Sequence, residues 1–383
     1  MSVLTRKQQL LVLAALVDGN SERAVERMTR EAGEGVTRKT VNGFALRMGT
    51  AAQWLHNARV RDLAFSLAEL DEIWSYVGKK QARVTPEEHA AGLGEAYSFV
   101  AFAMPARFVV TWKVGKRDSD TADAFAEDFR ARCAAMPALM TSDGFAPYIQ
   151  AIGRHFGPGV TYAQTVKHYT HSGQRDDDHR YEPPREPFVT KHAIFGSPDL
   201  DNATTAHLER FNGTTRHING RMRRLVYAFS KHPEHHRASV ALHYVYFNFC
   251  WTPEKVKKTP AMAIGVTSTL WDLGDLLDAL LAQEPCEPPA KKPIVIPVPP
   301  SAARQLPNGR GFLRLLPPGG GPATPAPAPA PTPTPAAPAP AIPAAQPAVE
   351  VNGQLDLFSW KPQATEPAKP LPPRGTQLDL FDR

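Results

Sequence analysis

The first 66 residues show the apolar spacing of short helices separated by turns. Ser and Thr at the expected starts can cap these helices, and Gly at the expected ends can terminate them. The predicted helices cover residues 5–17, 21 to 33 or 35, and 37–49, the last closed by Gly49. Two short helices followed by a turn and a third helix predict an all-α domain over residues 1–66 with the plan of a helix-turn-helix.

Residues 67–281 alternate between strand-like and helix-like stretches. The predicted strands are 70–77, 96–103, 107–114, 138–142 and 160–164, and the predicted helices are 119–136, 146–156 and a long helix over 205–225. The second and third strands flank Met104-Pro105-Ala106, which favours a hairpin or a meander. Strands first, with helices interleaved afterwards, predict an α/β domain built on a mixed sheet.

The composition changes at about residue 282. Of the 38 prolines, 26 fall between Pro285 and Pro373, many of them alternating with alanine. Such a segment has too little apolar surface to form a core, so we predict a disordered Pro/Ala-rich tail over residues 282–383.

Charge and cysteine usage narrow the class of protein. The formal net charge is +6 and the sequence pI is about 9.2, which suits a polyanionic partner but is weak evidence alone. Three widely spaced cysteines without a CxxC pair indicate neither a disulfide framework nor a zinc site, and favour a reducing cytosol. The N-terminal apolar run lacks a cleavage site, and no later run reaches membrane-spanning length. We therefore expect a soluble cytoplasmic protein.

Three acidic residues occupy positions from which they can converge. Asp71 lies in the first predicted strand of the middle domain, Asp143 ends another strand, and Glu209 lies near the start of the long helix. Carboxylates are hard oxygen ligands that suit Mg²⁺ or Mn²⁺. Two such ions can activate the attacking oxygen and stabilise the leaving oxygen of a phosphodiester.

Each acidic residue also has an ordinary structural explanation. Asp143 precedes Gly144, and Asp-Gly is a common turn. Asp71 is followed by Glu72, which strand alternation directs to the other face of the sheet. Taken singly, either residue is compatible with a solvated position.

Basic and amide side chains form two candidate DNA contacts. On the predicted long helix, one stripe of polar residues follows Glu209 and ends in guanidinium groups, which suits DNA phosphates. This stripe supplies the candidates Asn212, Arg216 and Arg223. The start of the third N-terminal helix, which in a helix-turn-helix reaches base edges, supplies Arg38, Lys39, Thr40 and Asn42. A three-helix bundle with a solvated basic turn is the alternative for the N-terminal segment, and a solvated helix face for the stripe.

Four stretches carry a resemblance to a known family. They are DEIWSYVGKK, which begins at Asp71, the SDG that contains Asp143, HLERFNGTTRHINGRMRRLVYAFSK, and HYVYFNFCWTPEKVKKTPAMAIGVTSTLW. Together they resemble DDE transposases of bacterial insertion sequences, closest to the insertion-sequence-one group, over about residues 5 to 275. The block from Glu209 to Asn212 is the most specific part of this resemblance.

The resemblance implies an RNase H-like catalytic domain over residues 67–281, preceded by a DNA-binding domain. Asp71, Asp143 and Glu209 would be its catalytic and metal-binding triad, with Mg²⁺ or Mn²⁺ as cofactor. Such enzymes use water to free a 3′-hydroxyl at the ends of the element, and then use that hydroxyl to attack target DNA. The implied partner is double-stranded DNA, bound by a homo-oligomer that brings two ends together.

Two features depart from the family pattern. Members with a full-length DNA-binding region often carry an N-terminal cysteine zinc motif, whereas this chain has no cysteine before Cys133. End recognition would then depend on the helix-turn-helix alone, or be altered. Residues 171–186 are highly charged and interrupted by prolines, which leaves the spacing before Glu209 uncertain.

The tail contains the pentapeptide QLDLF twice, at residues 354–358 and 377–381. This sequence resembles the short motif by which bacterial replication and repair proteins bind the sliding clamp. The resemblance implies clamp contacts through Gln354, Leu357, Phe358, Gln377, Leu380 and Phe381. A chance apolar patch or a duplicated tail segment is the alternative.

The sequence therefore predicts an active DNA transposase, with three other hypotheses left open. A transposase-derived protein could bind DNA without cutting it, and a clamp-tethered adaptor could only position DNA. A structure-specific nuclease could use the same fold. Metal-dependent cleavage separates the enzymes from the two binding proteins, and strand joining excludes the nuclease.

Overall fold

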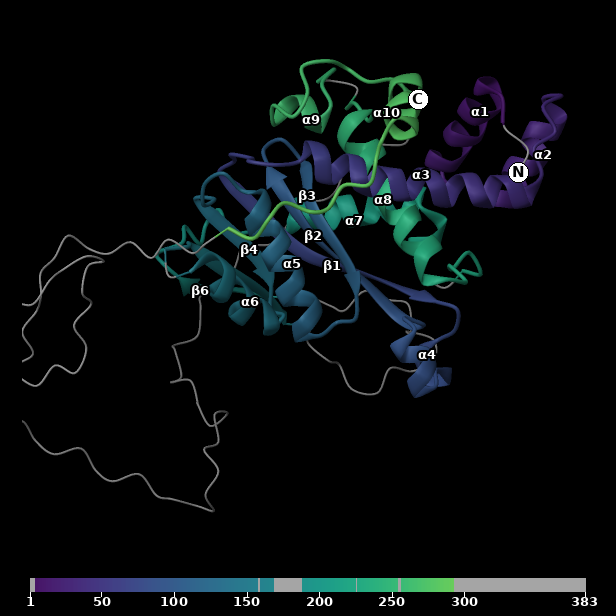
Figure 1. Ribbon diagram of the computed structural model, residues 1–383. Coiled ribbons are helices and arrows are strands. Elements are labelled where there is room, and N and C mark those ends of the chain that lie inside the picture. Colours follow the sequence, from purple (N-terminus) through teal and green to yellow (C-terminus); the bar gives the residue numbers. More distant parts are fainter. Residues whose placement is uncertain (1–3, 158, 169–187, 225, 254–255, 293–383) are drawn as a thin grey trace, which may run out of the picture. The chain divides into compact units, whose positions relative to one another are not determined.

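The computed structural model describes residues 4–157, 159–168, 188–224, 226–253 and 256–292 (Figure 1). Its centre is a six-stranded sheet with the order β3-β2-β1-β4-β5-β6. The strands are β1 (Leu67–Val77), β2 (Gly94–Met104), β3 (Phe108–Gly115), β4 (Leu139–Asp143), β5 (Tyr162–His168) and β6 (Phe188–Phe195). The pairs β1–β2, β2–β3 and β5–β6 are antiparallel, whereas β1–β4 and β4–β5 are parallel.

The connections explain this mixed sheet. The predicted hairpin is confirmed as β2 and β3, joined through a turn that contains the cis peptide bond Met104-Pro105. The parallel pairs need crossovers, which α5 (Ser119–Arg132) and α6 (Pro147–Phe156) supply. The prediction of a mixed α/β fold is confirmed, and the strand order is compatible with the RNase H-like fold that the resemblance implies.

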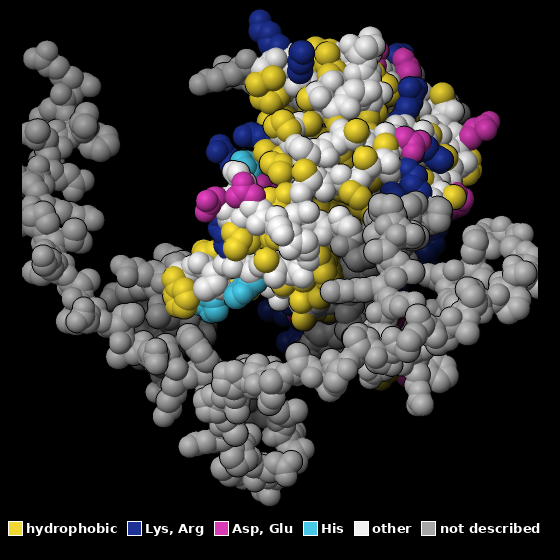
Figure 2. Space-filling model, turned by 90° about the vertical axis from the view of Figure 1, so that its left-hand side faces the viewer, with side chains coloured by type: hydrophobic (Ala, Val, Ile, Leu, Met, Phe, Trp, Pro, Cys, Tyr) yellow, Lys and Arg dark blue, Asp and Glu magenta, His cyan; other side chains and the backbone are white. Residues whose placement is uncertain are grey.

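Strand β6 forms one edge of the sheet. Its side chains are mostly exposed, including Phe188 and Val189 at its start. Figure 2 shows hydrophobic side chains spread among charged and polar ones over one face of the molecule. Scattered exposed apolar groups of this kind are usual on protein surfaces and do not by themselves indicate a binding site.

Three helices precede the sheet: α1 (Arg6–Val17), α2 (Glu22–Glu31) and α3 (Arg38–Arg59). Their predicted starts are confirmed, because Thr5, Ser21 and Thr37 each accept a hydrogen bond from the backbone N–H three residues later. The predicted end of the third helix at Gly49 is wrong, since α3 continues for another ten residues to Arg59.

Close packing explains the glycine inside α3. A Cβ atom added to Gly49 would lie 2.2 Å from the carbonyl oxygen of Ala238, in helix α8 (Pro233–Phe249). Gly49 therefore lets two backbones approach each other, and it does not terminate the helix. Figure 1 shows α3 and α8 along the same side of the sheet.

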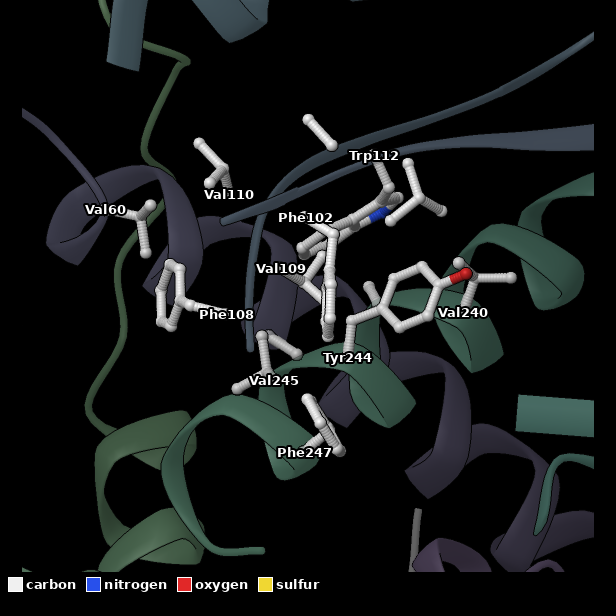
Figure 3. Packing of buried hydrophobic residues seen from close by; sticks show 14 of the residues in the cluster. Val60, Phe102, Phe108, Val109, Val110, Trp112, Val240, Tyr244, Val245 and Phe247 are labelled. Atoms are coloured by element: carbon white, nitrogen blue, oxygen red, sulfur yellow. The ribbon is translucent and has the colours of Figure 1, made fainter. Parts of the chain in front are cut away.

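The N-terminal helices and the sheet share one hydrophobic core. On the side of the sheet covered by α3 and α8, Phe102, Phe108 and Trp112 from β2 and β3 meet Tyr244 and Phe247 from α8 (Figure 3). All five side chains are buried. The predicted division at residue 66 stays a prediction, but the segments on its two sides are packed together.

The predicted long helix over 205–225 is wrong at its C-terminal end. Helix α7 spans Ala206–Ile218, and a short 3-10 turn, Gly220–Met222, follows it. Asn219 lies between them, where its side chain accepts a hydrogen bond from the backbone N–H of Arg221. The carbonyl group of Ile218 lies against Gly19, where an added Cβ would come within 1.8 Å of it. The turn between α1 and α2 thus occupies the space next to the helix end.

The remaining described elements are short. They are a 3-10 turn (Gln81–Arg83), α4 (Pro86–Ala90), α9 (Pro260–Ala263) and α10 (Leu273–Leu281). Arg6 in α1 makes a paired salt bridge with Asp278 in α10. Within the described residues, no helix combines the length and the apolar character needed to cross a membrane.

The described part of the predicted tail, residues 282–292, lies against the folded body. Asn57 donates to the carbonyl oxygen of Cys286 over 2.8 Å, and Lys292 pairs with Asp62 over 2.7 Å. The rest of the predicted tail, both QLDLF copies and the charged stretch 171–186 lie outside the described residues.

Replacing Gly49 by alanine tests the close packing of α3 on α8. We expect the free energy of unfolding to fall by about 1–3 kcal/mol, because the added methyl group must displace backbone. Gly213 in α7 is the matched control, since a Cβ there meets nothing within 4 Å. Gly213→Ala should be neutral or stabilise by about 0.5–1 kcal/mol. Urea denaturation measures both, and equal effects would contradict the packing argument.

Candidate active site

The parallel pairing of β1 with β4 brings two of the predicted acidic residues together. Leu70 pairs with Ser142, so the next residues, Asp71 and Asp143, lie side by side where β4 ends. One carboxylate oxygen from each of Asp71, Glu72 and Asp143 lies within 4.8 Å of the others. Sequence reasoning identified Asp71 and Asp143 and left Glu72 out of the site.

Glu72 does project to the other face of β1, as alternation predicted. Asp71 accepts a hydrogen bond from the Asn212 amide of α7 over 2.8 Å, whereas Glu72 accepts one from the Tyr148 hydroxyl of α6 over 3.3 Å. Because β4 ends at Asp143, the carboxylate of Asp143 can approach both faces. The adjacent Asp71 and Glu72 are the signal in the sequence that points to Glu72 as a member of the site. Interpreting this signal requires knowing that β4 ends at Asp143.

Burial and mutual repulsion perturb this cluster. Burial, then the charge of Asp143, raises the pKa of Asp71 to about 7. Burial, then the charge of Asp143, also raises the pKa of Glu72 to about 7, although Arg117 opposes the shift. The pKa of Asp143 is raised, mainly by burial. Clustered carboxyls with raised pKa values are typical of functional sites.

Arg117 partly neutralises the acidic cluster. Its Nε atom lies 2.7 Å from Glu72 Oε1, and its Nη2 atom lies 3.5 Å from Asp143 Oδ2. The guanidinium also lies 4.1 Å from the centre of the Phe145 ring. The segment between β3 and α5 thus supplies a cation that bridges two of the three clustered carboxylates.

Glu209 is close to the cluster but lies outside the group defined by the 4.8 Å limit. Lys167 Nζ lies 2.5 Å from Glu209 Oε2, and the Thr205 hydroxyl donates to Oε1 over 2.7 Å. The charge of Glu209 nevertheless contributes to the raised pKa values of Asp71 and Asp143. Glu209 also lies one helical turn before Asn212, which contacts Asp71, so α7 brings it near the acidic cluster. Its catalytic role stays a prediction.

Glu69 positions the helix that carries Glu209. Helix α7 has no capping bond from its own N-cap residue, Thr205. Instead the buried carboxylate of Glu69, on β1, accepts hydrogen bonds from the backbone N–H of Leu208 over 2.8 Å and from His207 Nδ1 over 2.6 Å. A carboxylate at a helix N-terminus also interacts favourably with the helix dipole.

Two of the predicted DNA contacts lie next to Asp71. Asn212 is buried and donates to Asp71, and burial lowers the pKa of Arg216 while the charge of Asp71 opposes that shift. Within the described residues, the buried atoms Asn212 Oδ1, Arg216 Nε and Tyr244 Oη have no hydrogen-bond partner. Buried polar atoms are normally satisfied, so these three indicate a polar site beside the carboxylates.

The donor set fits a divalent cation of the Mg²⁺ or Mn²⁺ type. Three carboxylate oxygens converge from two strands, they repel one another, and Asn212, which contacts Asp71, has a buried oxygen without a partner. Hard oxygen donors of this kind are the ligands these ions prefer. Asp71, Glu72 and Asp143 are the residues best placed to hold such an ion.

Four of the five other predicted DNA contacts border a separate cleft of about 1730 Å³. Arg38, Lys39 and Asn42 line it from α3, and Arg223 and Lys231 line it from the segment between α7 and α8. Arg38 and Lys39 are exposed, whereas the Asn42 amide donates to Glu22 over 2.9 Å. Thr40 is not among the lining residues, and its backbone N–H donates to the hydroxyl of the N-cap residue of α3.

Arg223 does not continue the polar stripe of the helix. It donates to the carbonyl oxygens of Arg216 and His217, at the C-terminal end of α7. This position follows from the early end of α7, which separates Arg223 from the face that carries Asn212.

Comparisons with known proteins add little to this geometry. No family model matches the chain, and no curated protein matches it. A cryo-EM structure of a piggyBac transposase synaptic complex with hairpin DNA is similar over 73% of this chain and 72% of that chain, with a TM-score of 0.37 and 7% sequence identity. A similarity of this degree is too low to assign a fold or a function.

The raised pKa values predict how stability depends on pH and on Mg²⁺. Asp71 and Glu72 titrate near pH 7 in the folded protein, above their ordinary values of 3.8 and 4.5. The folded state thus binds protons more tightly, so the free energy of unfolding should fall as the pH rises from about 4 to about 7. Mg²⁺ relieves repulsion between deprotonated carboxylates, so it should raise Tm more at about pH 8 than at about pH 5.

Thermal melts with and without Mg²⁺ measure this dependence. Asp71→Asn should reduce both the pH dependence and the Mg²⁺ effect, because it removes one titrating ligand. An equal Mg²⁺ effect at the two pH values would contradict a metal site made of these carboxylates.

A substitution of Glu69 tests whether its carboxylate anchors the N-terminal end of α7 to β1. Glu69→Ala should lower the free energy of unfolding by about 1–3 kcal/mol, because the buried Leu208 N–H loses its acceptor. The control is Glu31→Ala in α2, whose side chain is 76% exposed, and we expect a change within about 0.5 kcal/mol. Chemical denaturation distinguishes the two, and an effect of Glu69→Ala no larger than that of the control would exclude the capping role.

Proposed function

We propose that this chain is a metal-dependent DNA transposase. It would cleave the ends of a mobile element and join the freed 3′-hydroxyl to target DNA. The observation that carries this proposal is the convergence of Asp71, Glu72 and Asp143 on adjacent strands of a sheet whose order is compatible with an RNase H-like fold. The family resemblance of the sequence blocks around these residues and Glu209 supports the same function.

The acidic cluster would hold the metal. Asp71 and Asp143 are the expected ligands, with Glu72 and Glu209 close enough to take part or to tune the charge. Bound Mg²⁺ or Mn²⁺ supplies the positive charge that favours formation of the attacking oxyanion and stabilises the leaving oxygen.

The protein's own residues prepare this site. Asn212 orients Asp71 through a hydrogen bond, and Arg117 holds Glu72 in place. Glu69 anchors α7, and with it Glu209, against β1. Arg216, half-buried near Asp71, supplies a guanidinium that can bind a phosphate once DNA enters. These contacts pre-organise charge around the scissile phosphate, which is the main way in which a protein assists phosphoryl transfer.

The partner that fits this arrangement is DNA. The exposed Arg38 and Lys39 line the cleft with Arg223 and Lys231, and such side chains bind phosphates whatever the base sequence. In this proposal the N-terminal helices recognise element ends, and a homo-oligomer assembles on DNA because two ends must be joined. Binding to the sliding clamp through the two QLDLF motifs stays a prediction, as does a cytoplasmic, nucleoid-associated location.

A cleavage and strand-transfer assay on element-end DNA tests the proposed function. Asp71→Asn and Glu209→Gln should each lower the Mg²⁺-dependent rate about a hundredfold or more, because metal stabilisation of the transition state is worth several kcal/mol. Glu31→Gln in α2 is the control for removing one exposed carboxylate and should leave the rate unchanged.

The products decide between the hypotheses. Joined strands that require Mg²⁺ and Asp71 support a transposase, whereas cleavage without joining indicates a nuclease. DNA binding without any cleavage by the wild-type protein would refute the catalytic proposal in favour of a DNA-binding protein.

A further inference from the structure

One aromatic side chain is almost completely exposed. Tyr227, in the segment between α7 and α8, is 98% accessible to solvent, more than any other exposed large hydrophobic side chain among the described residues. Arg223 and Arg224 precede it and Lys231 follows it, all three exposed. An isolated exposed ring needs no explanation by itself, but this one lies two residues before Phe229, which belongs to a group of contacting rings.

The contacting rings run along β1 and continue to Phe229, in the segment that also carries Tyr227. The Trp74 and Tyr76 rings have centroids 5.8 Å apart, and the Phe229 ring stacks on Tyr76 at 4.6 Å with an interplanar angle of 29°. All three are half-buried, so part of each ring surface reaches solvent. Tyr227 precedes Phe229 by two residues in the same segment, and both side chains line the cleft described above. We call Trp74, Tyr76, Phe229 and Tyr227 the aromatic series.

The segment that carries Phe229 and Tyr227 is attached to β1. Ser230 forms a parallel bridge with Val77, and its carbonyl oxygen accepts a hydrogen bond from the backbone N–H of Gly78 over 2.8 Å. This attachment explains how the aromatic series passes from the strand to the segment without interruption.

The aromatic series begins next to the acidic cluster. Glu72, Trp74 and Tyr76 alternate along β1 and therefore lie on the same face of the sheet. Tyr97 of β2 pairs directly with Trp74, and the charges of Arg117 and Arg224 both act on its pKa. The rings thus extend from the carboxylates along β1 towards the cleft, which Tyr227 and Phe229 also line.

The charges around the series favour a polyanion. Lys231 Nζ lies 3.8 Å from the centre of the Phe229 ring, and the exposed Arg223 and Arg224 flank Tyr227 in the chain. The opposing charges are Glu72, on the same face of β1, Glu95, which pairs with Tyr76 across the β1–β2 ladder, and Glu234 at the start of α8. Basic groups therefore predominate at the Tyr227 end.

We propose that the aromatic series binds unpaired DNA bases next to the scissile phosphate. The physical reason is that unpaired bases expose flat faces that stack on aromatic rings, while the adjacent phosphates bind Arg and Lys. Bases inside a duplex are already stacked on each other and cannot offer these faces. This inference rests on the proposed function for the identity of the nucleic acid, and it adds a preference for unpaired over fully paired DNA.

Binding of full-length protein to two DNA probes tests the inference. One probe is a blunt duplex, and the other is the same duplex with an unpaired thymidine extension at its 3′ end. Both are measured by fluorescence anisotropy in EDTA, so that no cleavage occurs. The wild-type protein should bind the extended probe more tightly. Tyr227→Ala should weaken binding of the extended probe roughly 5- to 100-fold and change binding of the blunt probe little.

Two control variants separate stacking from other effects. Tyr227→Phe keeps the ring and should retain the preference for the extended probe, whereas loss of the preference would overturn the stacking argument. Leu270→Ala removes another exposed apolar side chain, 54% accessible, which does not belong to the series, and it should change neither affinity.

The outcomes distinguish this inference from the proposed function. Equal binding of both probes by the wild type, or an unchanged preference in Tyr227→Ala, overturns the inference even if the enzyme cleaves and joins DNA. A clear preference that depends on the Tyr227 ring supports the inference even if the same protein shows no catalytic activity.

Discussion

The parallel pairing of β1 with β4 is the constraint on which the candidate site depends. This pairing places the carboxylates of Asp71 and Asp143 side by side in a partly buried position. Burial and repulsion between negative charges raise the pKa values of both residues there. Three polar groups offset part of this repulsion. Arg117 contacts Glu72, Lys167 contacts Glu209, and the Asn212 amide contacts Asp71. The stability of the fold and the affinity for a cation are therefore linked, since a bound ion relieves the same repulsion.

Strand β1 organises most of the functional features along one segment of chain. Glu69 anchors α7, Asp71 and Glu72 contribute to the acidic cluster, and Trp74 and Tyr76 begin the aromatic series. These groups can serve different purposes because alternate residues face opposite sides of the sheet. The strand thus couples the helix carrying Glu209 on one face to the proposed stacking surface on the other.

A partly buried polar network connects the N-terminal helices to β1. Glu22 accepts from Asn42 and pairs with Arg221, which donates to Ser230. His236, buried in α8, then contacts both Ser230 and Ser75 at 3.1 and 3.0 Å. Burial lowers the pKa of His236 to about 4, so this histidine is neutral near pH 7. Together with the shared core, the network fixes the predicted DNA-contacting end of α3 relative to the sheet.

Caps, turns and strand alternation act between near neighbours, so local signals in the sequence determined several features. These are the caps of α1, α2 and α3, the β2–β3 hairpin, helices α5 and α6, and the choice of Asp71 and Asp143 as candidate site residues. Helix α8 and strand β6 escaped prediction: α8 is buried almost all round and β6 is mostly exposed, so neither has the one-sided pattern that identifies an element. Tertiary contacts decided the rest. Gly49 serves close packing on Ala238, α7 stops where its end meets Gly19, and Glu72 joins the acidic cluster because β4 ends beside it. Each depends on segments far apart in the chain, which no local pattern encodes.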